Sequence, residues 1–195
     1  MTELKPPAGF IDTPHPPALG HDQLVTRVEE IVVERPLAQV MAAIAASEHA
    51  DWIQEAGGLP GVKGTHVLTE HGAFDAPGSR HMVFLTDGST IVEQVLEKVA
   101  TPTEHRLRYV VWNYTSATAK PLRYGHAEFV YAALDERRTR IRWTYGFELR
   151  RDRFPGFLGP LGGPLLKAAF LNGPYAKWMR ACLGHLKANA EAWKG

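Results

Sequence analysis

Apolar and polar residues alternate along several stretches of the chain, most clearly between residues 138 and 150. There an aromatic and aliphatic series alternates with arginine, threonine and glutamate. A period of two places successive side chains on opposite faces of a strand, so this stretch predicts a strand with one aromatic and one solvated face. Its arginines fit that solvated face better than a nucleic-acid surface. The aromatic series is Ile141, Trp143, Tyr145, Phe147 and Leu149.

Six further β-type runs are rich in β-branched or aromatic residues and are bounded by turn residues. The last six of the seven runs follow one another through short links, which indicates an antiparallel meander. We therefore expect an α+β fold with a seven-stranded antiparallel sheet. The predicted strands cover 24–34, 62–70, 80–86, 90–99, 105–114, 123–134 and 138–150.

Two short helices are predicted between the first and second strands. Pro36 suits the first turn of an amphipathic helix over 36–46, because proline is tolerated where the N–H has no helical partner. Ser47 is a suitable N-cap for a second helix over 47–55. The order of elements is then one strand, two helices and six strands.

The carboxyl-terminal part changes character. A Gly/Pro-rich stretch at 154–164 predicts a loop, and an apolar helical segment follows at 165–171. Asn172-Gly173-Pro174 predicts a break or a kink. From Tyr175 onward an apolar stripe at helical spacing predicts a long amphipathic helix, and the apolar sheet face is the only large surface on which it can pack.

The dipeptide Asp87-Gly88 between two strands predicts a two-residue type I′ hairpin. In that register the apolar inner face also carries Arg80 and Glu93. Inward ionisable groups are costly unless they are paired, so they form either a structural ion pair or the polar groups of a ligand cavity. The predicted pairs are Phe84 with Ile91, Met82 with Glu93 and Arg80 with Val95.

The same alternation assigns further side chains to the inner face or to the apolar stripe of the last helix. A mostly apolar concavity with a few placed polar groups is typical of a ligand pocket. The alternative is a fully packed core in which tyrosine hydroxyls reach the rim. The predicted ligand-binding residues are Met82, Phe84, Tyr109, Asn113, Phe129, Tyr131, Trp143, Tyr175, Trp178 and Met179.

Composition narrows the class of protein. The 195 residues are 45% hydrophobic, which suits one domain over 23–195 after a proline-rich arm at 1–22. The 22 Lys+Arg balance 21 Asp+Glu, so no global field favours nucleic acid. One cysteine and the absence of a signal pattern or an apolar span favour a cytoplasmic protein with no integral membrane segment. We expect a monomer or homodimer.

Common catalytic and metal-binding motifs are missing. The sequence has no G-x-S-x-G, H-E-x-x-H, Walker A or G-x-G-x-x-G motif. Its nine histidines show no metal-ligand spacing, and strand parity places His81 and His126 on the face away from the lining. Cys182 falls on the apolar stripe, where a buried, inert thiol is expected. We therefore expect neither a metal nor a cofactor.

Several segments carry a resemblance to a known family: VTRVEEIVVERPLAQVMAAI (25–44), Asp51-Trp52, GSRHMVFLTDGSTIVEQV (78–95), LRYVV (107–111), Gly125 and TRIRWTYGFEL (139–149). With these segments, the order of elements resembles the helix-grip fold of the START and birch-pollen-allergen-like superfamily, and the sequence is similar to its SRPBCC, polyketide cyclase/dehydrase-like proteins. The resemblance implies a curved sheet wrapped around the carboxyl-terminal helix and enclosing a hydrophobic cavity. Relatives bind lipids, sterols, aromatic polyketides or plant hormones, and some cyclise and dehydrate polyketides.

Three functions follow as hypotheses. As a cofactor-independent polyketide cyclase/dehydratase, the protein would use Glu93 as general acid/base, Arg80 to bind an enolate or carboxylate oxygen, and Tyr145 or Tyr109 as a further donor. As a non-catalytic carrier or sensor of lipids or other hydrophobic ligands, it would use the same cavity without proton transfer. As a cochaperone domain of the heat-shock-activator type, it would rely on an external surface.

Overall fold

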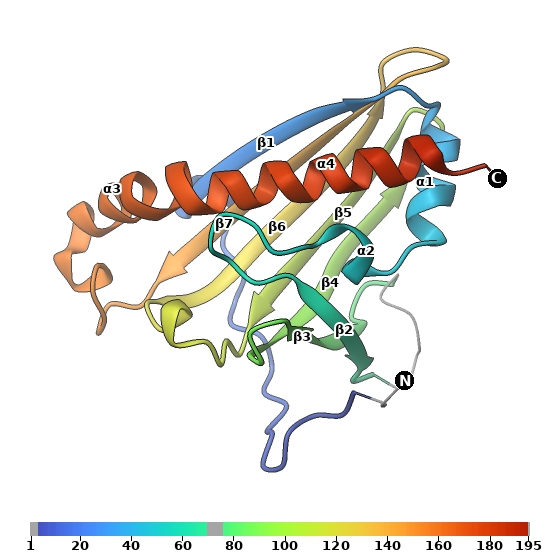
Figure 1. Ribbon diagram of the computed structural model, residues 1–195. Coiled ribbons are helices and arrows are strands. Elements are labelled where there is room, and N and C mark those ends of the chain that lie inside the picture. The colour runs from blue at the N-terminus through green and yellow to red at the C-terminus, as the bar shows by residue number, and fades with distance from the viewer. Residues whose placement is uncertain (1–3, 70–75, 195) are drawn as a thin grey trace.

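The computed structural model describes residues 4–69 and 76–194, and these form one seven-stranded antiparallel sheet with a long helix across its inner face (Figure 1). The strand order is β1-β7-β6-β5-β4-β3-β2, so β1 closes the meander at β7. The predicted α+β helix-grip architecture is confirmed. The strands are β1 Val25–Val33, β2 Val62–Val67, β3 Arg80–Leu85, β4 Thr90–Ala100, β5 Glu104–Trp112, β6 Leu122–Ala133 and β7 Thr139–Leu149.

The α-helices lie near the predicted places, with three differences. α3 begins at Gly162, inside the predicted loop at 154–164. Glu48, not Ser47, caps α2, because Glu48 and Asp51 form a reciprocal capping box. Pro174 does not break the last helix, since the π-helical turns of η4 absorb it and lead directly into α4. The helices are α1 Leu37–Ala45, α2 His49–Trp52, α3 Gly162–Leu166 and α4 Ala176–Ala192, with η1 His21–Gln23, η2 Ala117–Ala119, η3 Gly156–Leu161 and η4 Lys167–Tyr175.

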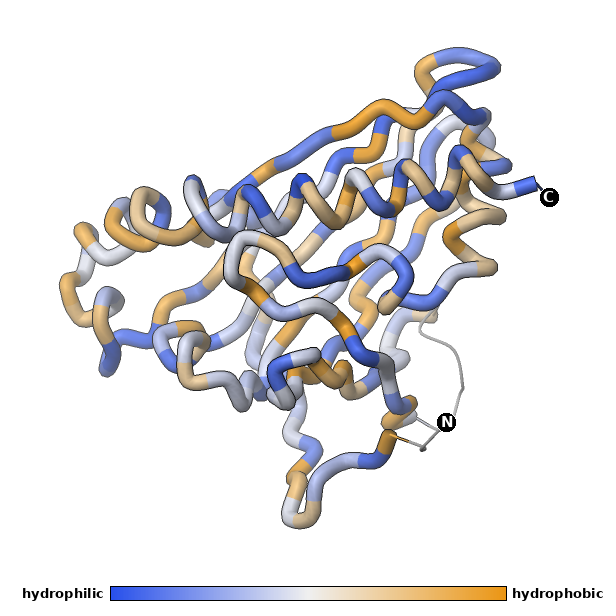
Figure 2. Tube along the Cα trace, viewed as in Figure 1, coloured by the Kyte–Doolittle hydropathy of each residue, from blue (hydrophilic) through white to orange (hydrophobic). Residues whose placement is uncertain are grey.

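The main core lies between the inner sheet face and α4. Hydrophobic and hydrophilic residues alternate along α4 (Figure 2), and its buried side includes Met179, Cys182 and Leu186. The predicted alternation of β7 is confirmed: Ile141 and Trp143 are buried in this core. Among the described residues no helix is long and apolar enough to cross a bilayer.

The amino-terminal arm covers the outer face of the same sheet, and Figure 1 shows it passing below and behind the strands. Its Phe10 and Leu19 pack on an outer cluster of apolar residues. Trp112 Nε1 donates to the Thr13 carbonyl over 3.1 Å. The predicted extended arm therefore serves as a cover for this face. The outer cluster consists of Val92, Val110, Trp112 and Tyr124.

The β3–β4 hairpin differs from its predicted register by one residue. The Leu85 N–H donates to the Ser89 carbonyl, so the loop has three residues and ends at Gly88, whose φ of +84° favours glycine. A shift of one residue reverses the faces of a strand. β3 therefore turns His81 inward and Arg80 outward, and the predicted inner pair of Arg80 with Glu93 is wrong. The observed pairs are Arg80 with Gln94, His81 with Glu93, Met82 with Val92, Val83 with Ile91 and Phe84 with Thr90.

Candidate functional site

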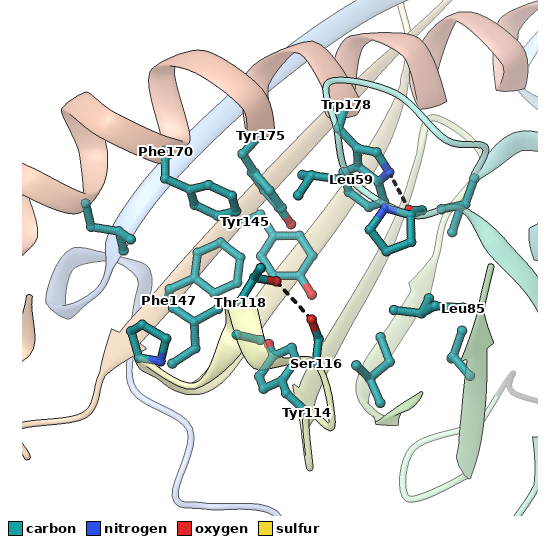
Figure 3. Close-up of a pocket in the computed structure, with 18 of the residues that line it drawn as sticks. Leu59, Leu85, Tyr114, Ser116, Thr118, Tyr145, Phe147, Phe170, Tyr175 and Trp178 are labelled. Atoms are coloured by element: carbon teal, nitrogen blue, oxygen red, sulfur yellow. Dashed lines mark hydrogen bonds between the residues drawn. The ribbon is translucent and has the colours of Figure 1, made fainter. Parts of the chain in front are cut away.

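An apolar cavity of about 370 Å³ lies between the inner sheet face, η4 and the start of α4. That volume is within the usual range for small-molecule sites. Figure 3 shows aromatic side chains entering it from β7, from the segment after β5 and from the last helix. Phe154 and Leu165 line the cavity and are also exposed, so they border its opening. The aromatic lining consists of Tyr109, Tyr114, Trp143, Tyr145, Phe147, Phe154, Phe170, Tyr175 and Trp178.

Four of these side chains are tyrosines: Tyr109, Tyr114, Tyr145 and Tyr175. Burial raises the pKa of each phenol above its usual value, and the carboxylate of Glu93 adds to the shift for Tyr109 and Tyr114. The phenols therefore stay neutral at physiological pH, and each can offer an O–H to a ligand oxygen. Among the described residues Tyr114 Oη meets no group in full hydrogen-bond geometry, and its nearest polar neighbours are the Tyr145 hydroxyl and the Gly125 backbone.

Gly125 on β6 makes room for two of these phenols. A Cβ at this position would lie 2.8 Å from Tyr114 Oη and 3.2 Å from Tyr145 Oη. Such contacts are too close for a side chain in a packed interior. The missing side chain of Gly125 thus lets the two hydroxyls converge at one place on the inner face.

A cluster of ionisable groups lies at one side of the cavity. Nε2 of His81 is 2.9 Å from Oε2 of Glu93, and both residues are buried. The ring of His49, the first residue of α2, stands edge-on to that of His81 with centroids 5.4 Å apart. Burial lowers the pKa of His49, and the charge of Glu93 opposes that shift. We call these three residues the His–Glu cluster.

A second cavity, of about 990 Å³, lies beyond the cluster under α1 and α2. It shares His49, Ile53, Glu93 and Tyr109 with the first cavity, so the His–Glu cluster forms part of the wall between the two. Basic residues enter its lining, whereas the first cavity has none of the described lysines or arginines in its wall. The basic lining residues are Lys63, Lys98 and Arg106.

Sequence and structure comparisons agree with this geometry. The family model of polyketide cyclases/dehydrases and lipid transport proteins matches residues 25–191. The chain belongs to this family. The matched range begins at the first residue of β1 and leaves the arm outside it. No functionally curated protein matches the sequence closely enough to count as a relative.

Several solved structures share the fold. The hypothetical protein jhp0584 from Helicobacter pylori superposes with a TM-score of 0.60 at 16% identity, covering 85% of this chain and 87% of that one. The Zhui aromatase/cyclase from Streptomyces sp. R1128 gives 0.57 at 14% identity, covering 85% and 93%. Ara h 8.0201 gives 0.55 at 13% identity, covering 85% and 96%. Identities this low establish the fold alone.

In this family member some of the predicted site residues lie in a cavity wall and others do not. Glu93 and Tyr145 lie in the wall of the first cavity, whereas Arg80 lies outside it. The Arg80 guanidinium pairs with Asp12 of the arm, with 3.0 Å between Nη2 and Oδ2. Arg80 is therefore a contact of the arm. Predicted ligand-binding residues that line a cavity are Tyr109, Phe129, Tyr131, Trp143, Tyr175 and Trp178.

The other predicted ligand-binding residues line neither cavity. Met82 is buried on the outer face and Phe84 shares its side of β3, because of the register shift. Asn113 has a φ of +54°, which ends β5, and its amide bonds Thr13 of the arm. Met179 is fully buried in the packed core beneath α4.

Sequence reasoning missed His49, His81 and Tyr114. His49 and His81 are 32 residues apart, so no local spacing could connect them, and the parity argument that turned His81 outward is wrong. For His126 the parity prediction is correct, because this residue lies on the outer face against the arm. Tyr114 follows the irregular residue Asn113, where alternation no longer indicates a face. A three-residue loop between β3 and β4, the alternative to the predicted two-residue turn, places His81 beside Glu93.

Proposed function

We propose that this protein binds a small, largely aromatic molecule that carries carbonyl or phenolic oxygens, such as an aromatic polyketide. The observation that carries the proposal is the set of four neutral phenols in the wall of an otherwise apolar cavity. Tyr109, Tyr145 and Tyr175 are buried, and Tyr114 is half-buried with its hydroxyl inaccessible. Aromatic walls suit a flat ring system, and phenol O–H groups suit its oxygens. A purely hydrocarbon ligand has no oxygen to accept a hydrogen bond from those hydroxyls.

The arrangement of the rings supports a flat ligand. Tyr145 stacks near Phe147 with centroids 4.9 Å apart, and Tyr175 meets Tyr145 edge-on at 5.5 Å. Trp178 Nε1 donates to the Pro60 carbonyl over 3.1 Å, which ties α4 to the loop before β2 (Figure 3). The cavity walls are thus held by packing and by this bond before any ligand enters.

Family membership supports a hydrophobic ligand, and the fold shared with an aromatase/cyclase supports a polyketide-like one. A second candidate function, acid–base catalysis, is favoured by the His81–Glu93 contact at 2.9 Å. In it Glu93 removes a proton from a carbon between two carbonyls, and phenols donate to the enolate oxygen. The enolate carbon then bonds to another carbonyl carbon, whose oxygen recovers the proton from Glu93. Elimination of this new hydroxyl with a hydrogen from the neighbouring carbon releases water and leaves a carbon–carbon double bond in the ring.

Fluorescence titration of the full chain tests binding with three probes: emodin, which is a hydroxylated anthraquinone, the oxygen-free anthracene, and oleic acid. Emodin should bind roughly tenfold or more tightly than anthracene, because each neutral hydrogen bond contributes about 0.5–1.5 kcal/mol. Tyr145→Phe should remove much of that difference. Equal affinity for emodin and anthracene, or preference for oleic acid, would contradict the proposal.

Mass spectrometry after incubation with a synthetic poly-β-keto thioester tests catalysis. A cyclising enzyme should release a product that has lost water, faster than the thioester cyclises alone. Glu93→Gln should stop this product while leaving emodin binding in place. If wild type and Glu93→Gln give the same products at the same rate, the protein is a carrier of the ligand and not an enzyme acting on it.

A further inference from the structure

We propose that the His–Glu cluster is a binding site for one divalent first-row transition-metal ion, with His49, His81 and Glu93 as its protein ligands. One ligand atom from each residue lies within 4.8 Å of the other two. The three come from α2, β3 and β4, so the tertiary fold alone brings them together. Nothing in the spacing of these residues along the chain suggests such a site.

The separation of the donor atoms suits a shared ion. Two atoms that bind one ion at about 2.1 Å lie about 3.0–3.4 Å apart at the usual coordination angles. The 2.9 Å between His81 Nε2 and Glu93 Oε2 is already close to that spacing. The ligand atom of His49 lies within 4.8 Å of the other two, so a side-chain movement of roughly 1–2 Å would bring it to the same spacing. His49 is the first residue of the four-residue helix α2.

The donor set indicates the class of ion. Two imidazoles and one carboxylate form the protein ligands of several catalytic zinc sites and of the iron sites in which one face of the ion stays open. Magnesium and calcium prefer oxygen ligands, so two nitrogen donors disfavour them. The carboxylate and the nearly complete burial of His81 and Glu93 favour a cation over a neutral occupant.

The position of the cluster leaves coordination places open toward both cavities, because His49 and Glu93 line each of them. A ligand oxygen could occupy one such place, where the ion would stabilise negative charge on an enolate or phenolate. A molecule with two neighbouring oxygens suits this best. This role of the ion rests on the proposed function, whereas the ion site itself does not.

Isothermal titration of metal-depleted full-length protein with Zn²⁺, and absorption spectroscopy with Co²⁺, test the site. Wild type should bind one ion per chain and give the visible absorption of Co²⁺ bound by nitrogen. Glu93→Gln and His81→Asn should each weaken Zn²⁺ roughly a hundredfold or more, since each removes one of three ligands. His66→Asn is the matched control, because His66 lines the second cavity outside the cluster and should leave affinity unchanged.

Folding must be separated from metal binding. His49→Asn removes a ligand and leaves the His81–Glu93 pair intact. Without metal it should still unfold cooperatively, with a midpoint lowered only by the lost ring contacts to His81 and Trp52, while Zn²⁺ no longer raises that midpoint. The proposal is overturned if wild type binds Zn²⁺ no more tightly than Glu93→Gln and His49→Asn, or if His66→Asn weakens binding equally.

Two further measurements separate this inference from the proposed function. Tyr145→Phe should bind Zn²⁺ as wild type does while its affinity for emodin falls. Metal-depleted wild type should still bind emodin, but more weakly than the Zn²⁺-loaded protein. If Zn²⁺ binds at the cluster and no organic probe binds, the ion site stands and the proposed function fails. If emodin binds and Zn²⁺ does not, the reverse holds.

Discussion

The two faces of the sheet bury the same kind of residue in different ways. On the outer face His126 donates from Nδ1 to the Leu19 carbonyl over 2.9 Å and stacks on His21 at 4.5 Å. On the inner face His81 meets the carboxylate of Glu93 at the boundary of two cavities. The outer histidine is held by the arm, whereas the inner one is held by another ionisable group.

This difference indicates where packing serves stability and where it leaves room for a ligand. The arm fills the outer face and supplies main-chain partners for its polar groups, as with Thr13 for Trp112. The inner face keeps open space beside Tyr114 and Glu93. Substitutions on the outer face should therefore act on folding, and those around the first cavity should act mainly on binding.

The largest expected effect is on the outer face. Trp112→Ala should lower the free energy of unfolding by about 3–5 kcal/mol, because a large buried side chain under the arm is removed. Leu85→Ala, on the partly open wall of the first cavity, should cost only about 1 kcal/mol. Urea unfolding of both variants measures the contrast. Equal losses would show that the two faces are packed alike.

Acid should also destabilise the outer face. Burial, and next the nearby His21, lower the pKa of His126 to about 4. A histidine in the unfolded chain titrates near pH 6.5. Between these values the unfolded chain binds a proton that the folded one does not, so stability present above about pH 6.5 is lost as pH falls toward 4.

The loss should be on the order of 2–3 kcal/mol. Urea unfolding of wild type and of His126→Gln between pH 4 and 7 measures it, because the variant lacks the titrating group and keeps an amide that can donate to Leu19. Wild type should lose stability more steeply with acid than the variant. Parallel curves for the two proteins would assign the acid sensitivity to other groups.

The contrast between faces also explains what the sequence could predict. Where one face is solvated, as on β7 with Arg140 and Arg142 exposed, alternation indicates the inner side correctly. β3 is apolar on both sides, with Val83 inward and Met82 outward, because the arm buries its outer face too. Alternation then cannot distinguish the two registers, and only the length of the turn at Gly88 decides.

The fold was predictable because it depends on many positions at once, and an error of one residue in one hairpin does not change it. The site depends on a few side chains. One shifted register exchanged Arg80 for His81 beside Glu93 and removed Met82 and Phe84 from the lining. The contact with His49 also required knowing where α2 lies relative to the sheet, which local patterns do not contain.

Gly125→Ala tests the space on the inner face. Its Cβ would lie 2.6 Å from Cε1 of Tyr145 and 2.8 Å from Tyr114 Oη, so both rings must move. We expect affinity for emodin to fall about tenfold, equivalent to about 1.4 kcal/mol. Gly184→Ala on α4 meets no atom within 4 Å and is the matched control. Unchanged affinity in Gly125→Ala would mean that the two hydroxyls do not contact the ligand.

The smallest effect compares one hydroxyl from each face. Tyr124 Oη accepts a hydrogen bond of 2.8 Å from the Leu19 N–H, so Tyr124→Phe leaves that donor unpaired and should cost about 1–2 kcal/mol of unfolding free energy. Among the described residues Tyr114 Oη makes no hydrogen bond of full geometry, so Tyr114→Phe should change stability by less than about 0.5 kcal/mol. In emodin titrations the order should reverse, with Tyr114→Phe several-fold weaker and Tyr124→Phe unchanged. Tyr114→Phe could instead destabilise the protein as much as Tyr124→Phe does and bind emodin normally. The Tyr114 hydroxyl would then contribute to folding and not to ligand binding, because a hydroxyl that only binds the ligand can be removed without loss of stability.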